Sequence, residues 1–331
     1  MRNHHIASPV CSVVIRCYNE KKHIGRLLHG LMQQTVQRLE IIVVDSGSTD
    51  GTLSIASRYP VRIVNIRPGD FSFGRSLNLG CAAAETPFIV IASAHVYPLY
   101  QDWIEQLVSA FDNPRVGLVY GKQRGGETTR FSEHQVFARW FPEKSVTTQC
   151  HPFCNNANSA IRSDLWKQFR YDEDLTGLED LDWANRIVNA GHQIAYQSDA
   201  VVVHLHDEIL WQTYNRYRRE AMAFKRIFPN ENFFIKDFLR LFFTNTISDY
   251  NNAARNGARS RDIYEIPLFR FMQFFGTYRG FKESGSITSQ LKQTFYYPNS
   301  NKPKPLPQRM RPDEPLLIDY KSERRTYREN R

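Results

Sequence analysis

Short apolar runs alternate with amphipathic segments through the first part of the chain. The apolar runs are rich in β-branched residues, as buried strands are, and lie at 12–15, 39–44, 61–66 and 87–92. Between them, apolar residues three or four positions apart predict helices at 23–34, 52–59 and 74–84. Strands that alternate with helices, without hairpin signals, predict an α/β fold with a mostly parallel sheet flanked by helices.

The rest of the chain changes character twice. Residues 123–152 show no clear periodicity, and the expected elements around them are helices at 102–113, 155–169 and 178–190 and strands at 116–121 and 193–203. From 209 onward the chain is helical and rich in aromatic and basic residues, and after about 284 the periodicity disappears. We therefore expect an α/β domain at 1–208, a helical extension at 209–283 and an extended or disordered tail at 284–331.

The composition of the chain favours anionic binding partners but does not distinguish between the kinds of anion. The 331 residues carry a formal net charge of +9 and are 41% hydrophobic, which is enough for one large domain with an extension. The positive charge favours an anionic partner, which would be a nucleotide diphosphate, a phospholipid surface or nucleic acid. Because a nucleic-acid interpretation would depend on charge alone, we predict no nucleic-acid partner.

Cysteine spacing and the amino-terminal segment bear on the compartment. The five cysteines form no pattern of paired spacings, and the first nine residues hold no apolar stretch, so we expect a cytoplasmic protein. No apolar run approaches the roughly 20 residues that span a bilayer. Any association with the cytoplasmic membrane is therefore expected to be peripheral.

Two polar clusters follow neighbouring strands directly. Residues 16–20 (Arg-Cys-Tyr-Asn-Glu) end the first strand, and 45–51 (Asp-Ser-Gly-Ser-Thr-Asp-Gly) end the second. In doubly wound sheets ligands bind beyond the carboxyl ends of the strands, which favours a shared binding crevice here. Asp45 would accept hydrogen bonds from a nucleobase or ribose in that crevice. The alternative is an Asx turn that caps the next helix.

In this order the two clusters resemble those of the family 2 glycosyltransferases, and the resemblance covers about residues 10–225. It implies a GT-A (Rossmann-like) fold, a nucleotide-diphosphate sugar as donor, inversion at the anomeric carbon and usually a divalent cation. It also implies that Arg16, Asn19, Glu20, Asp45 and Ser46 bind the donor nucleotide.

A third segment is similar to one branch of this family. Residues 75–80 (Arg-Ser-Leu-Asn-Leu-Gly) resemble a helix of the bacterial polysaccharide branch, which includes rhamnosyltransferases. The resemblance implies donor contacts from Arg75 and Asn78, with Arg75 near the diphosphate. The alternative for Arg75 is an ordinary surface arginine.

One replacement departs from the family pattern. Ser93-Ala94-His95 stands where the family carries an Asp-x-Asp triplet that binds the metal ion and the donor. By this position we expect Ser93 and Ala94 to contact the donor and His95 to be a metal ligand. Imidazole favours Mn or another transition metal over Mg, which prefers oxygen ligands. The alternative is that His95 contacts the diphosphate without any metal.

A second candidate ligand follows the predicted strand at 193–203. In the family a histidine at this place often completes the metal site, and this chain carries His204 and His206 there. We expect these two side chains to point to opposite sides unless the backbone turns. We therefore assign His204, and not His206, to the metal.

The acceptor side is predicted from residues 179–183 (Glu-Asp-Leu-Asp-Trp), which are similar to the Glu-Asp-x-Asp signature of the family. Inverting transfer needs a carboxylate that takes the proton of the acceptor hydroxyl. The resemblance gives this role to Asp180, with Glu179 orienting its surroundings. The alternative is a helix whose acidic first turn complements the helix dipole. Asn156, Asn158 and Trp183 are assigned to acceptor binding.

Residues 214–226 interleave five basic residues with aromatic ones. Such a segment suits a donor diphosphate, nucleic acid or an anionic membrane surface, and the alternative is a solvated helix face. Because a transferase of this kind usually meets a lipid-linked acceptor, we favour the membrane surface.

We therefore predict an inverting glycosyltransferase of polysaccharide synthesis. It would move a hexose or deoxyhexose from a UDP-, dTDP- or GDP-sugar to a hydroxyl of a glycan or lipid-linked glycan. A nucleotidyltransferase is one alternative, but it would need a glycine-rich loop after the first strand. The other is a catalytically silent glycan-binding or scaffold protein, which would explain the missing aspartates but not the carboxylates of Asp45, Glu179 and Asp180.

Overall fold

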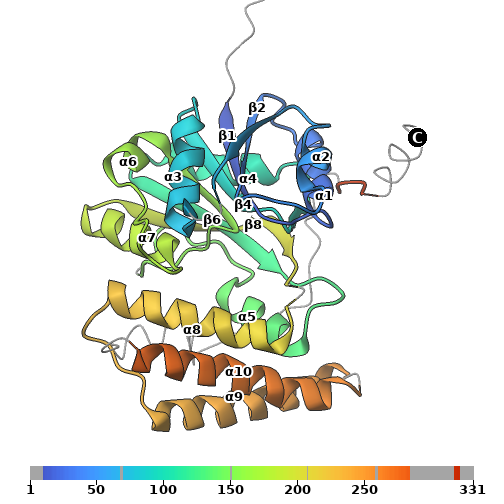
Figure 1. The fold of residues 1–331 in the computed structure, drawn as a ribbon, viewed down its shortest axis with the longest axis vertical. Coiled ribbons are helices and arrows are strands. Elements are labelled where there is room, and N and C mark those ends of the chain that lie inside the picture. The colour runs from blue at the N-terminus through green and yellow to red at the C-terminus, as the bar shows by residue number, and fades with distance from the viewer. Residues whose placement is uncertain are drawn as a thin grey trace, which may run out of the picture.

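A single eight-stranded sheet organises the first two thirds of the molecule (Figure 1). The computed structural model describes residues 10–67, 70–149, 151–206, 208–257, 260–283 and 317–320. The strands are ordered β3-β2-β1-β4-β7-β6-β8-β5 across the sheet. Neighbours that are far apart in the sequence therefore meet at its centre.

The sheet consists of two parts that join where β4 pairs with β7. β1 (Cys11–Cys17), β2 (Leu39–Asp45), β3 (Val61–Asn65) and β4 (Phe88–Ser93) are parallel. β7 (Asn158–Arg162) is antiparallel to both β4 and β6 (Val116–Arg124). β6 is parallel to β8 (Gln193–His204), and β5 (Val96–Pro98) is antiparallel at the edge. The predicted α/β fold with a mostly parallel sheet is confirmed.

Helices cover both faces of the sheet. α1 (Ile24–Met32), α2 (Thr52–Ala56), α4 (Trp103–Ser109) and the 3-10 helix η2 (Ala110–Asp112) pack on one face. α3 (Phe73–Ala83), α6 (Ser163–Gln168) and α7 (Glu179–Asn189) pack on the other. In β1, Val13 and Ile15 join the first hydrophobic core and Val14 joins the second, because side chains alternate along a strand.

Two segments differ from the expected elements. Residues 155–169, predicted as one helix, contain β7 followed by α6, and 123–152 contains the helix α5 (Phe131–Trp140). β7 has the sequence Asn-Ser-Ala-Ile-Arg, with few residues that favour strands. Its conformation therefore comes from pairing with β4 and β6, which local propensity does not reveal.

A layer of long helices lies below the sheet in Figure 1. In the described part of the chain it consists of α8 (Leu210–Ile227), α9 (Ile235–Asn256) and α10 (Asp262–Lys282). α10 approaches α8 closely, because a Cβ atom at Gly276 or Gly280 would lie 2.5 or 2.3 Å from a backbone oxygen of α8. None of the described helices is long and apolar enough to cross a membrane. The predicted domain boundary near residue 208 coincides with the start of this layer and stays a prediction.

Part of the predicted tail contacts the sheet domain. Leu317 pairs with Tyr100, and the Tyr320 hydroxyl donates a hydrogen bond to the carbonyl of Pro98 at 2.6 Å. Residues 284–316 and 321–331 lie outside the described residues, so the extended or disordered tail stays a prediction.

Candidate active site

The loops that follow β1 and β2 are hydrogen-bonded to each other. Asn19 has a left-handed backbone conformation with φ of 53°, and its side-chain oxygen accepts the N–H of Thr49 at 2.8 Å. The N–H groups of Asn19 and Glu20 donate to the hydroxyls of Ser48 and Thr52, each at 2.8 Å. These bonds bring the two polar clusters of the sequence together at one edge of the sheet.

Asp45 is hydrogen-bonded within its own loop. One carboxylate oxygen accepts the N–H groups of Gly47 and Ser48 at 2.9 Å, and the other accepts the Ser48 hydroxyl at 2.5 Å. This is the Asx turn given above as the alternative. Because a carboxylate accepts about four hydrogen bonds, one more would be compatible with this geometry. The contact of Asp45 with the donor stays a prediction, as does that of the neighbouring, nearly buried Ser46.

The Ser93-Ala94-His95 segment lies beside the first of these loops. Ser93 pairs with Arg16 in the parallel register of β1 and β4, and Ala94 is fully buried. The Nδ1 atom of His95 donates to a carboxylate oxygen of Glu20 at 2.7 Å. The position that carries Asp-x-Asp in the family is therefore in direct contact with the loop after β1.

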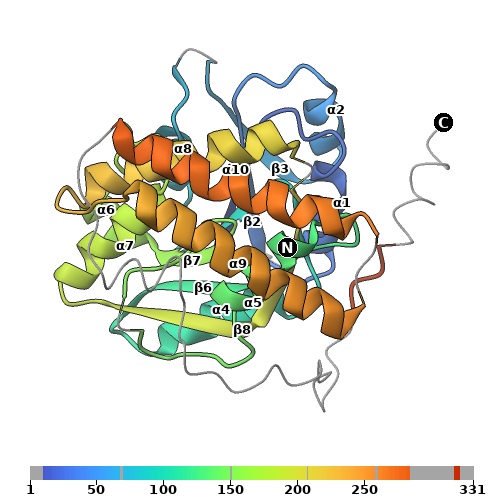
Figure 2. The same ribbon diagram turned by 90° about the horizontal axis from the view of Figure 1, so that it is seen from below.

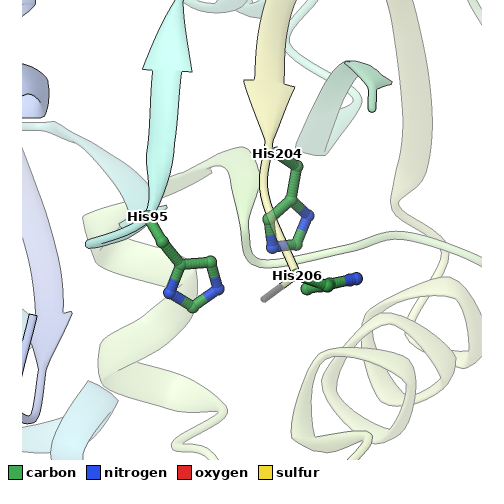
Figure 3. Close-up of side chains that lie close together, drawn as sticks. All are labelled: His95, His204 and His206. Carbon is green, nitrogen blue, oxygen red and sulfur yellow. The ribbon is translucent and has the colours of Figure 1, made fainter. Parts of the chain in front are cut away.

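Three histidines meet at the strand ends (Figure 3). His95 follows β4, His204 ends β8, and His206 lies two residues farther along the chain. The ring centroids of His95 and His204 are 5.0 Å apart, and those of His204 and His206 are 4.2 Å apart. One ring nitrogen of each histidine lies within 4.8 Å of one from each of the others. We call these residues the histidine cluster.

The expectation that His204 and His206 point apart was wrong. Successive side chains of an extended chain alternate, so residues two positions apart lie on the same side. His206 therefore joins His95 and His204 and is a third candidate metal ligand (Figure 3).

Each histidine of the cluster is held through its Nδ1 atom. The acceptor oxygens belong to Glu20 for His95, Gln123 for His204 and Glu133 for His206, and each lies at 2.7 Å. Because carboxylate and amide oxygens can only accept, Nδ1 donates and the lone pair of the neutral ring is on Nε2. Histidines that bind metals are oriented in the same way by a second group.

Burial favours the neutral form of two of these rings. Burial, together with the charges of His206, His95 and Arg216, holds the pKa of His204 well below its usual range. Burial and Arg216 lower the pKa of His206, although Glu133 opposes them. Neutral imidazole is the form that binds a metal ion.

Glu133 connects the histidine cluster to α5 and α8. One of its oxygens accepts hydrogen bonds from His206 Nδ1 at 2.7 Å and from Arg216 Nη2 at 2.8 Å. Burial disfavours the charged carboxylate, but the hydrogen bond from His206 and the charge of Arg216 outweigh burial and lower the Glu133 pKa to about 2. Glu133 is therefore ionised at neutral pH and fixes the position of His206.

The same network bears on the basic segment 214–226, which lies in α8. Arg216 pairs with Glu133 and Glu208, Arg218 pairs with Glu283, and Arg226 pairs with Asp174. Acidic partners thus neutralise three of the five basic residues of this segment. The structure gives no support for this segment as the contact with a membrane.

The donor atoms of the histidine cluster fit a transition-metal ion. Metal–nitrogen bonds of about 2.1 Å put two ligand nitrogens about 3–4 Å apart. From separations of up to 4.8 Å, the rings would need to close by about 1 Å around an ion. Three imidazoles favour Mn, Fe, Co or Zn over Mg, which prefers oxygen.

Asp180 lies at the start of α7 and has an unusual environment. Its two carboxylate oxygens accept the backbone N–H groups of Asn156 at 3.0 Å and Leu181 at 2.8 Å. Burial and the adjacent charge of Glu179 raise the pKa of Asp180 to about 7, although these hydrogen bonds and Arg16 oppose the shift. A carboxyl group that titrates near neutral pH is well matched to take a proton from a hydroxyl.

Glu179 joins this helix to the loop after β1. Its carboxylate accepts a hydrogen bond from Arg16 at 2.7 Å, and the two side chains are 5% and 18% exposed. The Arg16 guanidinium also lies 5.3 Å from the centre of the Phe73 ring in α3. The pair therefore links the predicted donor side of the site to the helix that carries Asp180.

Asn156 carries a buried donor group beside Asp180. The residue is 1% exposed, and its side-chain oxygen accepts the Ser159 hydroxyl at 3.0 Å. Its Nδ2 atom has no hydrogen-bond partner among the described residues. Leaving a buried amide unpaired costs about 1–3 kcal/mol, which a bound ligand would offset.

Other assigned residues are used within the fold. Asn78 makes four hydrogen bonds to residues 166–173, and Asn158 makes three to residues of α4, β6 and β8. Trp183 is fully buried and donates to the Phe169 carbonyl. These bonds fix neighbouring elements, so the structure does not favour ligand contacts for these three. Arg75 is half exposed, 3.5 Å from a Glu173 oxygen, and its donor contact stays a prediction.

Three residues of the site were missed from the sequence. Gln123 and Glu133 fell in the stretch without clear periodicity, which hid both the end of β6 and the helix α5. His206 was set aside by the error about side-chain direction. The spacing of two between His204 and His206 was the signal that identifies it.

The mostly parallel sheet with helices on both faces corresponds to the GT-A fold. A family model described as glycosyl transferase family 2 matches residues 12–169. An O-antigen chain rhamnosyltransferase of Salmonella anatum is 28% identical over 229 residues, covering 63% of this chain and 70% of that protein. One from Salmonella typhimurium is 28% identical over 220 residues, covering 62% and 69%.

Solved structures share the fold at lower identity. A mannosyltransferase from Pyrobaculum calidifontis, in complex with GDP-Man and Mn2+, has a TM-score of 0.59 at 18% identity and covers 84% of this chain and 89% of its own. TarS of S. aureus in complex with UDP-GlcNAc has a TM-score of 0.51 at 15% identity, covering 83% and 91%. Residues 12–169 of the chain are therefore similar to the family 2 glycosyltransferases, and the solved structures share the fold of the chain.

Proposed function

We propose that this chain is an inverting transferase that moves a deoxyhexose or hexose from a nucleotide-diphosphate sugar to a hydroxyl of a glycan or lipid-linked glycan. The observation that carries the proposal is the Asp180 carboxyl, with a pKa of about 7, one residue from the Arg16–Glu179 ion pair. The rhamnosyltransferase relatives support a deoxyhexose, and the ligands GDP-Man and UDP-GlcNAc of the structural neighbours support a nucleotide-sugar donor.

The chemistry would be a single displacement. Asp180 takes the proton of the acceptor hydroxyl while that oxygen attacks the anomeric carbon from the side opposite the diphosphate. The bond from the anomeric carbon to the diphosphate oxygen breaks, and the nucleotide diphosphate leaves with the electron pair. Asn156 Nδ2 would donate a hydrogen bond to the acceptor and so acquire the partner that it lacks within the described residues. Glu179 keeps Arg16 at the edge where the donor would lie.

We further propose that His95, His204 and His206 hold a divalent cation, Mn or another transition metal rather than Mg. A bound ion would stabilise the negative charge of the departing diphosphate. The support is the convergence of the three rings and the orientation of each through Nδ1. The neighbour complexes with Mn2+, and with Mg2+ and UDP in glucosyl-3-phosphoglycerate synthase from Mycobacterium tuberculosis, support a divalent cation in general.

Thermal stability against a panel of nucleotides would test donor and metal together. The chain would be melted with UDP, dTDP or GDP, each alone, with Mn2+ and with Mg2+. A ligand of the folded state at 100 times its Kd stabilises by about 2.7 kcal/mol. We expect one nucleotide to raise Tm and Mn2+ to enlarge its effect. His206→Ala should remove the Mn2+ effect, whereas His192→Ala, which alters the residue just before β8, should retain it.

The outcomes separate the parts of the proposal. If the nucleotide raises Tm equally with and without metal, His95 would be assigned to a direct contact with the diphosphate instead of to a metal ion. The absence of a shift with every nucleotide would refute the donor assignment.

A further inference from the structure

An exposed apolar stripe runs along α9. Ile235, Leu239, Phe243, Ile247 and Tyr250 follow one another at intervals of three or four and are between 37% and 58% exposed. Residues at these intervals lie on one side of a helix. The other side of α9 is buried in the helical layer through residues such as Phe238 and Leu241. Among the described residues, the stripe is therefore not covered by packing.

α10 extends the same surface. Its residues Tyr264, Leu268 and Phe271 are 73%, 47% and 39% exposed. Ring contacts connect Phe271 through Phe242 to Phe243, with centroids 6.0 and 5.0 Å apart. Figure 2 shows α9 and α10 side by side, nearest the viewer on the underside of the molecule. We call the five exposed residues of α9 and these three of α10 the apolar face.

Basic residues predominate around the apolar face. The exposed charged residues of α9 and α10 are Lys236, Arg240, Arg255, Arg279 and Lys282, and Arg261 precedes α10. Two acidic residues accompany them: Glu265 of α10 is partly exposed near Arg261, and the exposed Glu283 after α10 pairs with Arg218. The two acidic residues of α9, Asp237 and Asp249, are buried. An apolar surface edged by positive charge is typical of helices that lie in the interface of an anionic membrane.

We propose that the apolar face docks on an anionic lipid bilayer, with α9 and α10 lying in the headgroup region. This inference rests on the proposed function in one respect, since a lipid-linked acceptor would be met at that surface. Soluble monomers rarely expose large contiguous apolar patches, and the apolar face consists of eight exposed apolar residues on two adjacent helices. A second copy of the chain fits less well, because a two-fold interface would bring two surfaces in which basic residues predominate against each other, even though Arg240 lies 3.4 Å from Asp237 and Arg261 lies 3.7 Å from Glu265.

Docking would also fix the active site relative to the bilayer. The hydrophobic cluster that contains Phe238 and Leu241 of α9 includes Leu181, the residue after Asp180 in α7. The layer that meets the lipid and the helix that carries Asp180 therefore share one core. Because that core is packed, the acceptor side of the site is held at a constant height above the membrane.

Vesicle sedimentation with the full chain would test the docking. We expect binding to vesicles of equimolar phosphatidylcholine and phosphatidylglycerol, much weaker binding to phosphatidylcholine alone, and weakening by salt. The double variant Phe243→Asp/Ile247→Asp should lose at least tenfold in affinity. Met32→Asp removes a residue of matched character, 40% exposed on α1, and should bind like the wild type.

A charge variant makes the test independent of the apolar substitutions. Lys236→Glu/Arg255→Glu leaves the apolar face intact, and two lost basic contacts at about fivefold each predict a loss of at least 25-fold on anionic vesicles. If Phe243→Asp/Ile247→Asp fails to fold, the charge variant alone tests the docking. Affinity for anionic vesicles that the charge variant leaves unchanged would overturn the proposal.

Sedimentation velocity without lipid distinguishes the other occupants. A wild-type dimer that Phe243→Asp/Ile247→Asp converts to a monomer, together with no vesicle binding, would assign the face to self-association and overturn the proposal. A monomer without vesicle binding would also overturn it. The nucleotide melting experiment needs no lipid, so the two proposals can fail separately. If a nucleotide raises Tm but the chain does not bind vesicles, only the docking is refuted. If the chain binds vesicles but no nucleotide raises Tm, only the donor assignment is refuted.

Discussion

Replacing Asp180 with asparagine should remove proton transfer without changing the binding of the donor. Asparagine has nearly the same size, and its side-chain oxygen can accept the N–H of Asn156 that now lies 3.0 Å from the carboxylate. It cannot take a proton from the acceptor. Loss of a general base lowers the rate about 10²–10⁴-fold, which corresponds to about 3–5 kcal/mol in the barrier. Donor binding should be unchanged, because the proposed role of Asp180 is to act on the acceptor hydroxyl.

The pKa of Asp180 fixes how the rate depends on pH. With a pKa of about 7, roughly a tenth of the carboxyl is ionised at pH 6 and nine tenths at pH 8. The kcat/KM of the wild type should therefore rise about tenfold over this interval and then level off. The profile of Asp180→Asn should lack this rise.

The same pKa shift predicts a change in stability. Folding raises the pKa above its unfolded value of 3.8, so the protonated form is favoured in the folded state. This contribution is present at low pH and is lost as the pH rises through about 7. At pH 8 the wild type must keep a buried charge that asparagine lacks, whereas at pH 5 its carboxyl is protonated. The difference in Tm between Asp180→Asn and the wild type should therefore be more positive at pH 8 than at pH 5.

Steady-state transfer assays across pH, with nucleotide melting as the measure of donor binding, would decide the point. Asp182→Asn is the matched control, because Asp182 lies in the same helical turn and pairs with Arg186 at 2.8 Å. It should keep the pH profile of the wild type. The role of Asp180 as base is refuted if Asp180→Asn loses donor binding together with transfer, or if its rate still rises between pH 6 and pH 8.

Three further substitutions test other parts of the site. Glu133→Gln should weaken Mn2+ binding about 10–100-fold, measured by competition with a fluorescent chelator, because Glu133 orients His206; unchanged affinity would exclude His206 as a ligand. Asn156→Ala should raise the acceptor KM and leave the nucleotide shift intact, and an unaltered KM would contradict an acceptor contact from its Nδ2 atom. Asn78→Ala should lower the free energy of unfolding by about 2–4 kcal/mol in urea titrations, because it removes partners of buried groups. A changed donor KM with unchanged stability would instead favour its predicted contact with the donor.

Much of the site was accessible from the sequence because it follows strand ends. The loops at 16–20 and 45–51 were expected to converge, and the hydrogen bonds of Asn19 to Ser48 and Thr49 show that they do. Register explains this success, since parallel neighbouring strands end at the same edge of the sheet. A motif that directly follows a strand is therefore informative about position even when its ligand is unknown.

Side-chain partners were much less accessible. The amide of Asn158 reaches α4, β6 and β8, and these contacts depend on a sheet order that places β7 between β4 and β6. That order could not be derived from a strand of such weak propensity. Glu133 was hidden for a related reason, because its helix α5 is amphipathic only weakly and packs against helices far along the chain.

The sheet order also limits how the molecule can be divided for expression. β6 is paired with β7 on one side and with β8 on the other, and β8 begins at Gln193. A truncated protein that ends at residue 169, where the match to the family model ends, would keep β6 and β7 but would lack β8. It would expose a long, buried-type strand as an edge, which is a template for aggregation. Such a fragment would be expected to accumulate in inclusion bodies, so crystallisation and screening should begin from a chain that retains β8 and the helices behind it.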